Sequence, residues 1–176
     1  MKEERIGALI ALHRHWLLAD AVRVVLKQKT ATAVQEEKSI KKFGLEYVAF
    51  GEKASMLCRM QVWYSLLYVV VEGYLALGEK YEPLDEVLAK DEYVSLLRRY
   101  RNATFHYQAD VLNDKLIEFL VKEDRELWMR DLNTQLEAFL MQALPISEAM
   151  GELEARGLPI IPVGTKLSVL FQRGEE

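Results

Sequence analysis

The chain has 176 residues, of which 51% are hydrophobic and 28% are charged, a composition typical of one folded domain and unlike that of a disordered protein. Lysine and arginine number 23 against 27 aspartate and glutamate residues, so the net charge is -4 and the pI is about 5.5. This balance excludes the global basic field of a non-specific nucleic-acid binder, so any nucleic-acid contact is local and we expect no DNA partner. The lone Cys58 excludes an intramolecular disulfide and a zinc site built from paired cysteines.

The sequence contains only weak candidates for a secretory signal or a membrane-spanning segment. Residues 2–5 are all charged and lack the apolar core of a secretory signal. The longest apolar run, residues 62–71, is interrupted by Ser65 and is too short to cross about 30 Å of hydrocarbon. We therefore expect a cytoplasmic protein with no membrane partner.

The first half of the chain predicts two long helices. Apolar residues recur at three- and four-residue spacing over residues 3–29 and predict a helix whose buried stripe is Ile6, Leu9, Ile10, Trp16, Leu17 and Val24. Residues 30–51 are less regular and are interpreted as a loop that leads into a helix. Residues 52–77 are apolar nearly all round, which predicts a central helix with Cys58, Trp63, Tyr64 and Tyr68 in the core.

The second half predicts shorter helices and an irregular end. Helices are expected near residues 84–89, from Asp91 onward, over residues 111–121 and over residues 124–144, where Pro145 ends the pattern. Beyond Gly157 the prolines predict extended backbone. The predicted fold class is therefore all-α: a bundle of four to five main helices over residues 1–150, with an extended C-terminal arm over residues 151–176.

Residues 98–107, with the sequence RRYRNATFHY, carry the most informative pattern. On a helix, Asn102 and His106 are four apart and therefore neighbours on the polar face, and the long side chain of Arg101 can reach them. Tyr107 is expected on the opposite, apolar side together with Tyr100. The spacing predicts that an arginine, an asparagine and a histidine converge on one small ligand.

This group suits the cleavage of a phosphodiester bond. A histidine with a pKa near 6.5 transfers protons at neutral pH, and an arginine holds two phosphate oxygens while charge builds up. The 2′-hydroxyl of RNA supplies the nucleophile, so no metal or cofactor is required. The alternative is a solvated helix face, because an arginine and a histidine five apart on such a face also occur by chance.

The run from Arg101 to His106 resembles the R-x4-6-H motif of the HEPN superfamily (higher eukaryotes and prokaryotes nucleotide-binding), which also favours a polar residue directly after the arginine. The resemblance implies a helical bundle that dimerises so that two motifs face each other and form a shared, metal-independent ribonuclease site. It implies Arg101, Asn102 and His106 as the catalytic group, and we expect Arg98 and Arg99 to bind the RNA substrate.

The resemblance also implies a biological setting, that of a toxin or defence ribonuclease with an antitoxin as its partner. Toxins paired with a nucleotidyltransferase tend to show R-x4-H-x-Y, whereas Gln108 occupies that tyrosine position here. The superfamily includes members that do not cut RNA. The alternative function is therefore a non-catalytic helical scaffold that binds a nucleotide, an RNA or a protein.

Other chemical groups in the sequence are less suggestive. His13 and His15 are two apart on a helix and therefore point to different sides, which argues against a shared metal ion. His13 lies on the apolar side and is expected in the core or in an interface. No Walker-type phosphate loop occurs in the sequence.

Overall fold

The computed structural model describes residues 2–29, 31–110 and 113–144. Every regular element in these ranges is a helix, which confirms the expected all-α class. Five of these helices have 11 or more residues, and they include α2, which lies where the sequence was interpreted as a loop. The expected C-terminal arm lies outside the described residues. The helices are α1 (Lys2–Val24), α2 (Ala33–Phe43), α3 (Leu45–Leu77), α4 (Glu82–Leu88), α5 (Asp91–Phe105), α6 (Asp114–Leu120) and α7 (Arg125–Ala143).

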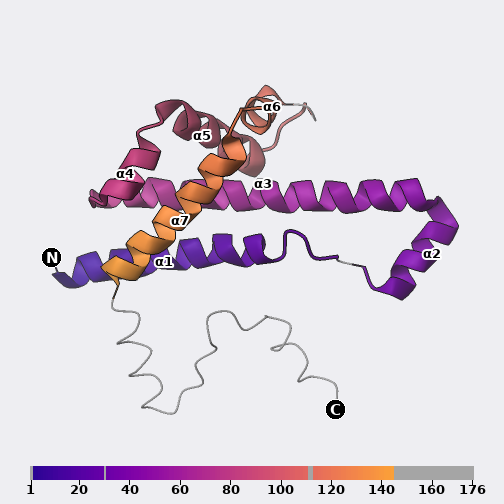
Figure 1. Cartoon of the computed structure of the whole chain (residues 1–176), viewed down its shortest axis with the longest axis horizontal. Helices are drawn as coiled ribbons and strands as arrows, with labels where there is room; N and C mark the ends of the chain where they lie inside the picture. Colours follow the sequence, from indigo (N-terminus) through magenta and orange to yellow (C-terminus); the bar gives the residue numbers. More distant parts are fainter. Residues whose placement is uncertain (1, 30, 111–112, 145–176) are drawn as a thin grey trace, which may run out of the picture.

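The longest helix, α3, organises the molecule (Figure 1). Helix α1 lies beside α3 and runs in the opposite direction, and α2 joins the two at one end. The helices α4 to α7 gather over the other half of α3, and α7 crosses α3 toward the N-terminal end of α1. The molecule therefore has a thick end, where six helices meet, and a thin end made of α2 and the first turns of α3.

The core occupies the thick end. Its largest fully buried side chains include Leu67 and Tyr74 of α3, Tyr100 of α5, Phe119 of α6 and Leu132 of α7. The expected core residues of α3, Trp63, Tyr64 and Tyr68, are also buried. In the described part of the chain, α3 alone is long and apolar enough to cross a membrane, but its C-terminal half is the centre of the bundle.

Helix α1 buries a narrower stripe than the sequence predicts. Leu9, Leu12, Trp16 and Ala19 face the core, whereas the expected core residues Ile6, Ile10, Leu17 and Val24 are exposed. The reason is that, among the described residues, α3 and α7 pack against one side of α1, and the exposed apolar side chains lie away from that side.

The thin end differs from expectation in two ways. Residues 30–51 contain the separate helix α2 (Ala33–Phe43). Thr32 caps its N-terminus with a capping box, and Gly44, whose φ of 89° favours glycine, caps its C-terminus. The central helix begins at Leu45 rather than at residue 52. No residue of α2 is buried, and Tyr47 and Phe50 of α3 are exposed.

Cys58 corrects a further prediction, because its side chain is exposed rather than buried in the core. The helices α4 to α7 cover only the C-terminal half of α3, so an apolar sequence does not bring burial to the other half. The later helices lie close to their expected ranges, except that residues 111–112 lie outside the description.

Candidate functional site

Helix α5 carries the motif and is fixed on α3 by its buried side. Leu97, Tyr100 and Ala103 face the core. The hydroxyl of Ser65 in α3 donates to Thr104 Oγ1 at 2.8 Å, and Thr104 donates in turn to the carbonyl of Tyr100 at 2.9 Å. These contacts bury one side of α5, so the neighbouring sides face outward. Residues 98, 101 and 102 share one of those sides, because residues 101 and 102 follow residue 98 by three and four positions.

Arg101 is held on three sides. Its Nη2 forms an ion pair with Glu72 of α3, its Nη1 donates to Asn102 Oδ1 at 2.9 Å, and its guanidinium carbon lies 5.2 Å from the ring centroid of Tyr68. The side chain is only 21% exposed. The structure thus brings Arg101 and Asn102 together, as their adjacency in the motif predicts, and adds an acidic and an aromatic partner.

Glu72 is the residue that the motif analysis missed. It is the only acidic residue between Glu52 and Glu79, a stretch that is otherwise largely apolar. A single carboxylate on a helix that is expected to be buried demands a positive partner, because an unpaired buried charge is costly. The sequence therefore indicates that Glu72 has a positive partner, but only the packing of α5 on α3 identifies that partner as Arg101.

The charged groups around Arg101 change the pKa of Tyr68. Burial raises the pKa of Tyr68, and the carboxylate of Glu72 raises it further, whereas Arg98 and Arg101 act in the opposite direction. Arg98 is therefore close enough to add positive charge beside Arg101. The buried Nε of Arg101 has no hydrogen-bond partner among the described residues, so one donor of the guanidinium remains uncommitted.

The structure separates Arg99 from this cluster. Arg99 forms an ion pair with Glu118 of α6, on a different side of α5. Arg98 is exposed and makes no ion pair with another described residue. Of the two arginines expected to bind substrate, Arg98 is the one that shares a side with Arg101.

His106 does not lie on the helix face as expected. Helix α5 ends at Phe105, and His106 is the C-cap residue with extended backbone, although its N–H still donates to the carbonyl of Asn102 at 3.1 Å. Its imidazole is exposed and makes no hydrogen bond with a described residue. Tyr107 is 93% exposed, so its expected place on the apolar side is wrong. The cause of both differences is that the helix ends before the motif does.

The segment after His106 is tied to α6 rather than free. The Nε2 of Gln108 donates to the carbonyl of His106 at 3.0 Å, and its Oε1 accepts from Asn113 Nδ2 at 2.9 Å. Asn113 is the N-cap of α6 and accepts from the backbone of Lys115. The backbone at His106 is thus anchored while its imidazole stays accessible.

No cluster of three histidine, cysteine or acidic residues suited to a metal occurs in the described part of the chain. His13 packs beside Trp16 with ring centroids 6.0 Å apart, and burial lowers the pKa of His13. This agrees with its expected place on the apolar side of α1.

No protein-family model, curated protein or solved structure matches the chain. The chemistry of the site therefore follows from its own geometry. A restrained guanidinium and a second arginine share one side of α5, and the exposed imidazole of His106 follows the last residue of the helix, without a contact to Arg101 among the described residues. The two arginines offer donors for a phosphate, and the imidazole offers a group that can exchange a proton.

Proposed function

We propose that the protein is a metal-independent endoribonuclease of HEPN type, with a composite active site at a dimer interface. The observation that supports this most is the restraint on Arg101, which Glu72, Asn102 and Tyr68 hold in one orientation beside Arg98. Restraint of this kind is what a charge-stabilising group needs, because a preorganised donor pays no reorganisation cost during reaction. The toxin or defence role remains part of this proposal.

The proposed reaction is an internal transesterification. The 2′-oxygen forms a bond to phosphorus, the bond from phosphorus to the 5′-oxygen breaks, and the products end in a 2′,3′-cyclic phosphate and a 5′-hydroxyl. His106 of one copy accepts the proton of the 2′-hydroxyl, and His106 of the other copy donates a proton to the leaving 5′-oxygen. Arg98 and Arg101 bind the phosphate oxygens.

The surface around His106 supports the proposed homodimer. Phe105 and Tyr107 flank His106, and both aromatic side chains are exposed. In a twofold dimer the same patch meets itself, so these rings would be buried as the two motifs approach each other. Sedimentation at micromolar concentration tests this point, since a monomer would remove the second histidine that the reaction needs.

The decisive experiment uses a labelled RNA with excess EDTA and an analysis of the product ends. Wild type should cut, and His106→Ala should lower the rate by roughly 10²–10⁴-fold. Because His106 is exposed and outside α5, the variant should keep its fold, as checked by circular dichroism, and sedimentation establishes that it still forms the dimer. Equal cutting by wild type and variant would rule out His106 as the acid–base group.

Arg101→Ala and Arg99→Ala form a matched pair for the same assay. Each removes one ion-paired arginine of α5, but only Arg101 belongs to the proposed site. Arg101→Ala should impair cleavage without shifting the pH optimum, because it removes charge stabilisation and no proton-transfer group. Arg99→Ala should retain most of the activity.

A second candidate function is a non-catalytic scaffold that binds RNA, a nucleotide or a protein through the same basic side of α5. The observation in its favour is the ion pair itself, because Glu72 neutralises the charge that Arg101 would offer to a transition state. RNA binding without cleavage by the wild-type dimer would favour this function.

A further inference from the structure

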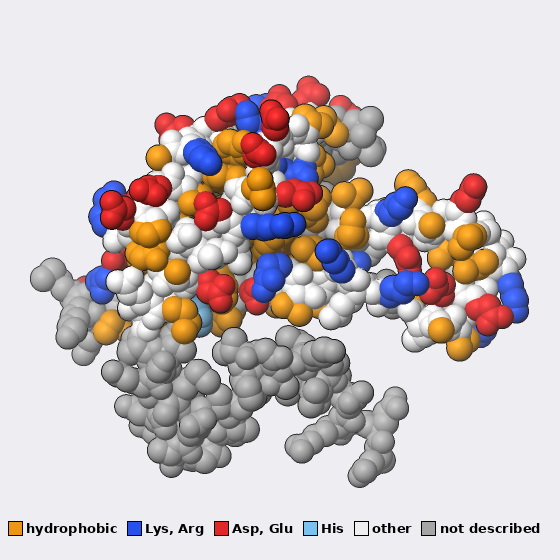
Figure 2. All heavy atoms as spheres, in the orientation of Figure 1, with side chains coloured by type: hydrophobic (Ala, Val, Ile, Leu, Met, Phe, Trp, Pro, Cys, Tyr) orange, Lys and Arg blue, Asp and Glu red, His pale blue; other side chains and the backbone are white. Residues whose placement is uncertain are grey.

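Helix α1 has a second apolar side that the described bundle leaves exposed. Ile6, Ile10, Leu17 and Val24 lie on it, with exposed fractions between 37% and 56%. They follow one another by four, seven and seven residues, which keeps the side chains in one line along the helix. We call this line the outer stripe of α1. Figure 2 shows hydrophobic side chains along the lower edge of the described chain, where α1 lies in Figure 1.

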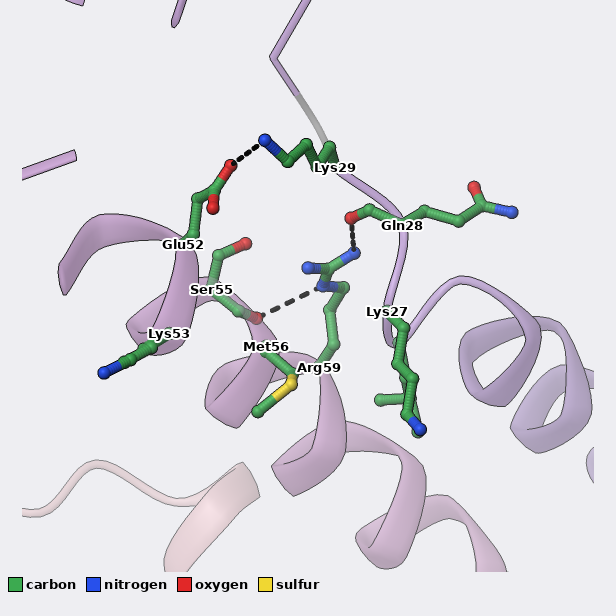
Figure 3. A pocket seen from close by; sticks show the side chains of 9 residues that line it. Lys27, Gln28, Lys29, Glu52, Lys53, Ser55, Met56 and Arg59 are labelled. Atoms are coloured by element: carbon green, nitrogen blue, oxygen red, sulfur yellow. Dashed lines mark hydrogen bonds and ion pairs between the residues drawn. The ribbon is translucent and has the colours of Figure 1, made fainter. Parts of the chain in front are cut away.

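Contacts at both ends of α1 fix which side of the helix faces the core. Near its start, Arg5 donates to both carboxylate oxygens of Glu79, at 2.6 and 2.7 Å. Just beyond its other end, the carbonyl of Gln28 accepts from Arg59 of α3 at 2.8 Å (Figure 3). Helix α1 therefore cannot turn its outer stripe toward the core without breaking these contacts. Any cover for the stripe comes from outside the described bundle.

Helix α7 brings the chain to the beginning of the outer stripe. Gln142 and Ala143 line one hollow together with Arg5, so the last turn of α7 lies beside the first turns of α1. Leu144 is buried and has extended backbone, with φ -112° and ψ 135°, the conformation favoured before a proline. The chain beyond Pro145 therefore starts close to Ile6.

The sequence directly after Pro145 has the pattern of an amphipathic helix. Its apolar residues recur at three- and four-residue spacing: Ile146, Ala149, Met150 and Leu153. On a helix, Glu148 and Glu152 fall away from this apolar side. A helix of about eight residues is unstable alone in water, so this segment needs a surface on which to fold.

Length selects the outer stripe over other exposed apolar side chains. Along α1 the distance from Ile6 to Leu17 is about 16 Å, and a helix of residues 146–153 is about 12 Å long. Phe50 at the thin end of the molecule is also exposed. However, about 40 Å of helix α3 separates Phe50 from Leu77, which lies near the end of α7. A segment that starts at Pro145 reaches the outer stripe first.

We propose that residues 146–153 fold back along α1 as a short helix and cover its outer stripe. The apolar side of this segment packs on Ile6, Ile10 and Leu17, and the burial of apolar surface on both partners stabilises the contact. A large exposed apolar surface on the bundle is thereby removed. This inference does not depend on the cleavage proposed at the Arg101 cluster.

The test measures how fast a maleimide reacts with a single cysteine on α1 of the full-length protein. Cys58→Ser first removes the exposed native thiol. Ile10→Cys and Leu17→Cys then place a thiol in the outer stripe, and Ala11→Cys is the matched control. Ala11 is also exposed, but one residue after Ile10 it is turned by about 100°. The two stripe thiols should react at least tenfold more slowly than the control. Equal rates would overturn the proposal.

A double substitution, Met150→Glu with Leu153→Glu, tests whether this segment is the cover. Charge on its apolar side should release the segment, so the thiol of Ile10→Cys should react as fast as that of Ala11→Cys. Glu148→Gln, on the opposite side of the segment, should leave the protection intact. Protection that survives the double substitution would mean that another surface covers the stripe, and it would overturn the proposal.

Dilution separates cover by the same chain from cover by a second copy. Protection should be constant between about 100 μM and about 1 μM protein, because a contact within one chain does not depend on concentration. Protection that is lost on dilution would overturn docking within one chain. His106→Ala should leave the labelling rates unchanged, so failure of cleavage and failure of this inference give different results.

Discussion

Glu72 of α3 holds the guanidinium of Arg101 of α5 through an ion pair that crosses the interface of the two helices. The pair fixes the direction of the arginine and also competes with any phosphate for its charge. An arginine has five N–H donors, and Glu72 and Asn102 occupy only part of them. The remaining donors can bind a phosphate while Glu72 keeps the side chain in place.

Glu72→Gln separates these two effects of the carboxylate. The amide keeps the shape of the side chain but removes its charge, so Arg101 is held less firmly and is no longer neutralised. In the proposed ribonuclease, kcat should fall about tenfold because orientation is lost, whereas KM should not rise. The free energy of unfolding should fall by no more than about 1 kcal/mol, since the pair is partly exposed.

Glu118→Gln is the control for Glu72→Gln, because Glu118 forms the corresponding ion pair with Arg99. It should cost a similar free energy of unfolding and leave kcat unchanged. An equal loss of kcat in the two variants would mean that Glu72 acts only through stability.

Most of the helices were predictable from the sequence, apart from α2 and the first turns of α3, but the surface that each helix buries was only partly so. Helix α1 is apolar on more than one side, and spacing alone did not show that Leu12 and Ala19 face the core while Ile10 and Leu17 do not. The N-terminal half of α3 also carries large apolar residues, yet Phe50 there is exposed, because burial depends on how far α4 to α7 extend. Both outcomes depend on tertiary packing, which a periodic pattern does not contain.

In the candidate site, contacts between neighbours in sequence were predictable, whereas contacts between helices were not. Arg101 and Asn102 are adjacent in sequence, so their contact followed from local geometry. The end of α5 before His106 could not be predicted from local geometry. No glycine or proline marks it, and the following residues are fixed by contacts of Gln108 with Asn113. Glu72 belongs to another helix, and only the packing of α5 on α3 assigns its partner.

Two buried tryptophans allow us to measure how much the hydrogen bond from Trp128 of α7 to Val87 contributes to the free energy of unfolding. The indole of Trp128 donates to the carbonyl of Val87, whereas the Nε1 of Trp16 is buried without a partner among the described residues. Replacement of either tryptophan by phenylalanine removes the same volume. Trp128→Phe should therefore lower the free energy of unfolding by at least about 1 kcal/mol more than Trp16→Phe, as measured by urea denaturation. Equal losses would contradict a stabilising role for this bond.

Because of Tyr74, we expect the free energy of unfolding to fall as the pH rises in the alkaline range. Burial and its hydrogen bond to Asp85, 2.8 Å long, raise the pKa of Tyr74 to about 12 in the folded protein. The unfolded chain ionises near pH 10, so the folded state holds its proton longer, and stability is lost as the pH rises from 10 to 12. The loss from this group should reach about 2–3 kcal/mol.

Urea denaturation at pH 9, 10, 11 and 12 measures this loss, about half of which has occurred by pH 11, and Tyr74→Phe should show a shallower decline than wild type. Tyr47→Phe is the control, because Tyr47 is exposed on α3 and its replacement should leave the slope unchanged. A wild-type slope retained in Tyr74→Phe would show that other groups cause the alkaline loss.

Mixing wild type with His106→Ala tests whether one active site needs histidines from two copies. If each reaction uses both copies of His106, a mixed dimer is inactive, and only wild-type homodimers cut RNA. With the amount of wild type fixed and subunits exchanged at random, an equal amount of His106→Ala should lower total cleavage to about one half, and a ninefold excess to about one tenth. Independent sites within each chain would leave the activity constant at every ratio. The diluent must be an inactive variant that still dimerises, so sedimentation of His106→Ala alone precedes the mixing experiment. Constant activity, with sedimentation confirming that mixed dimers form, would assign catalysis to a single chain and exclude the shared site.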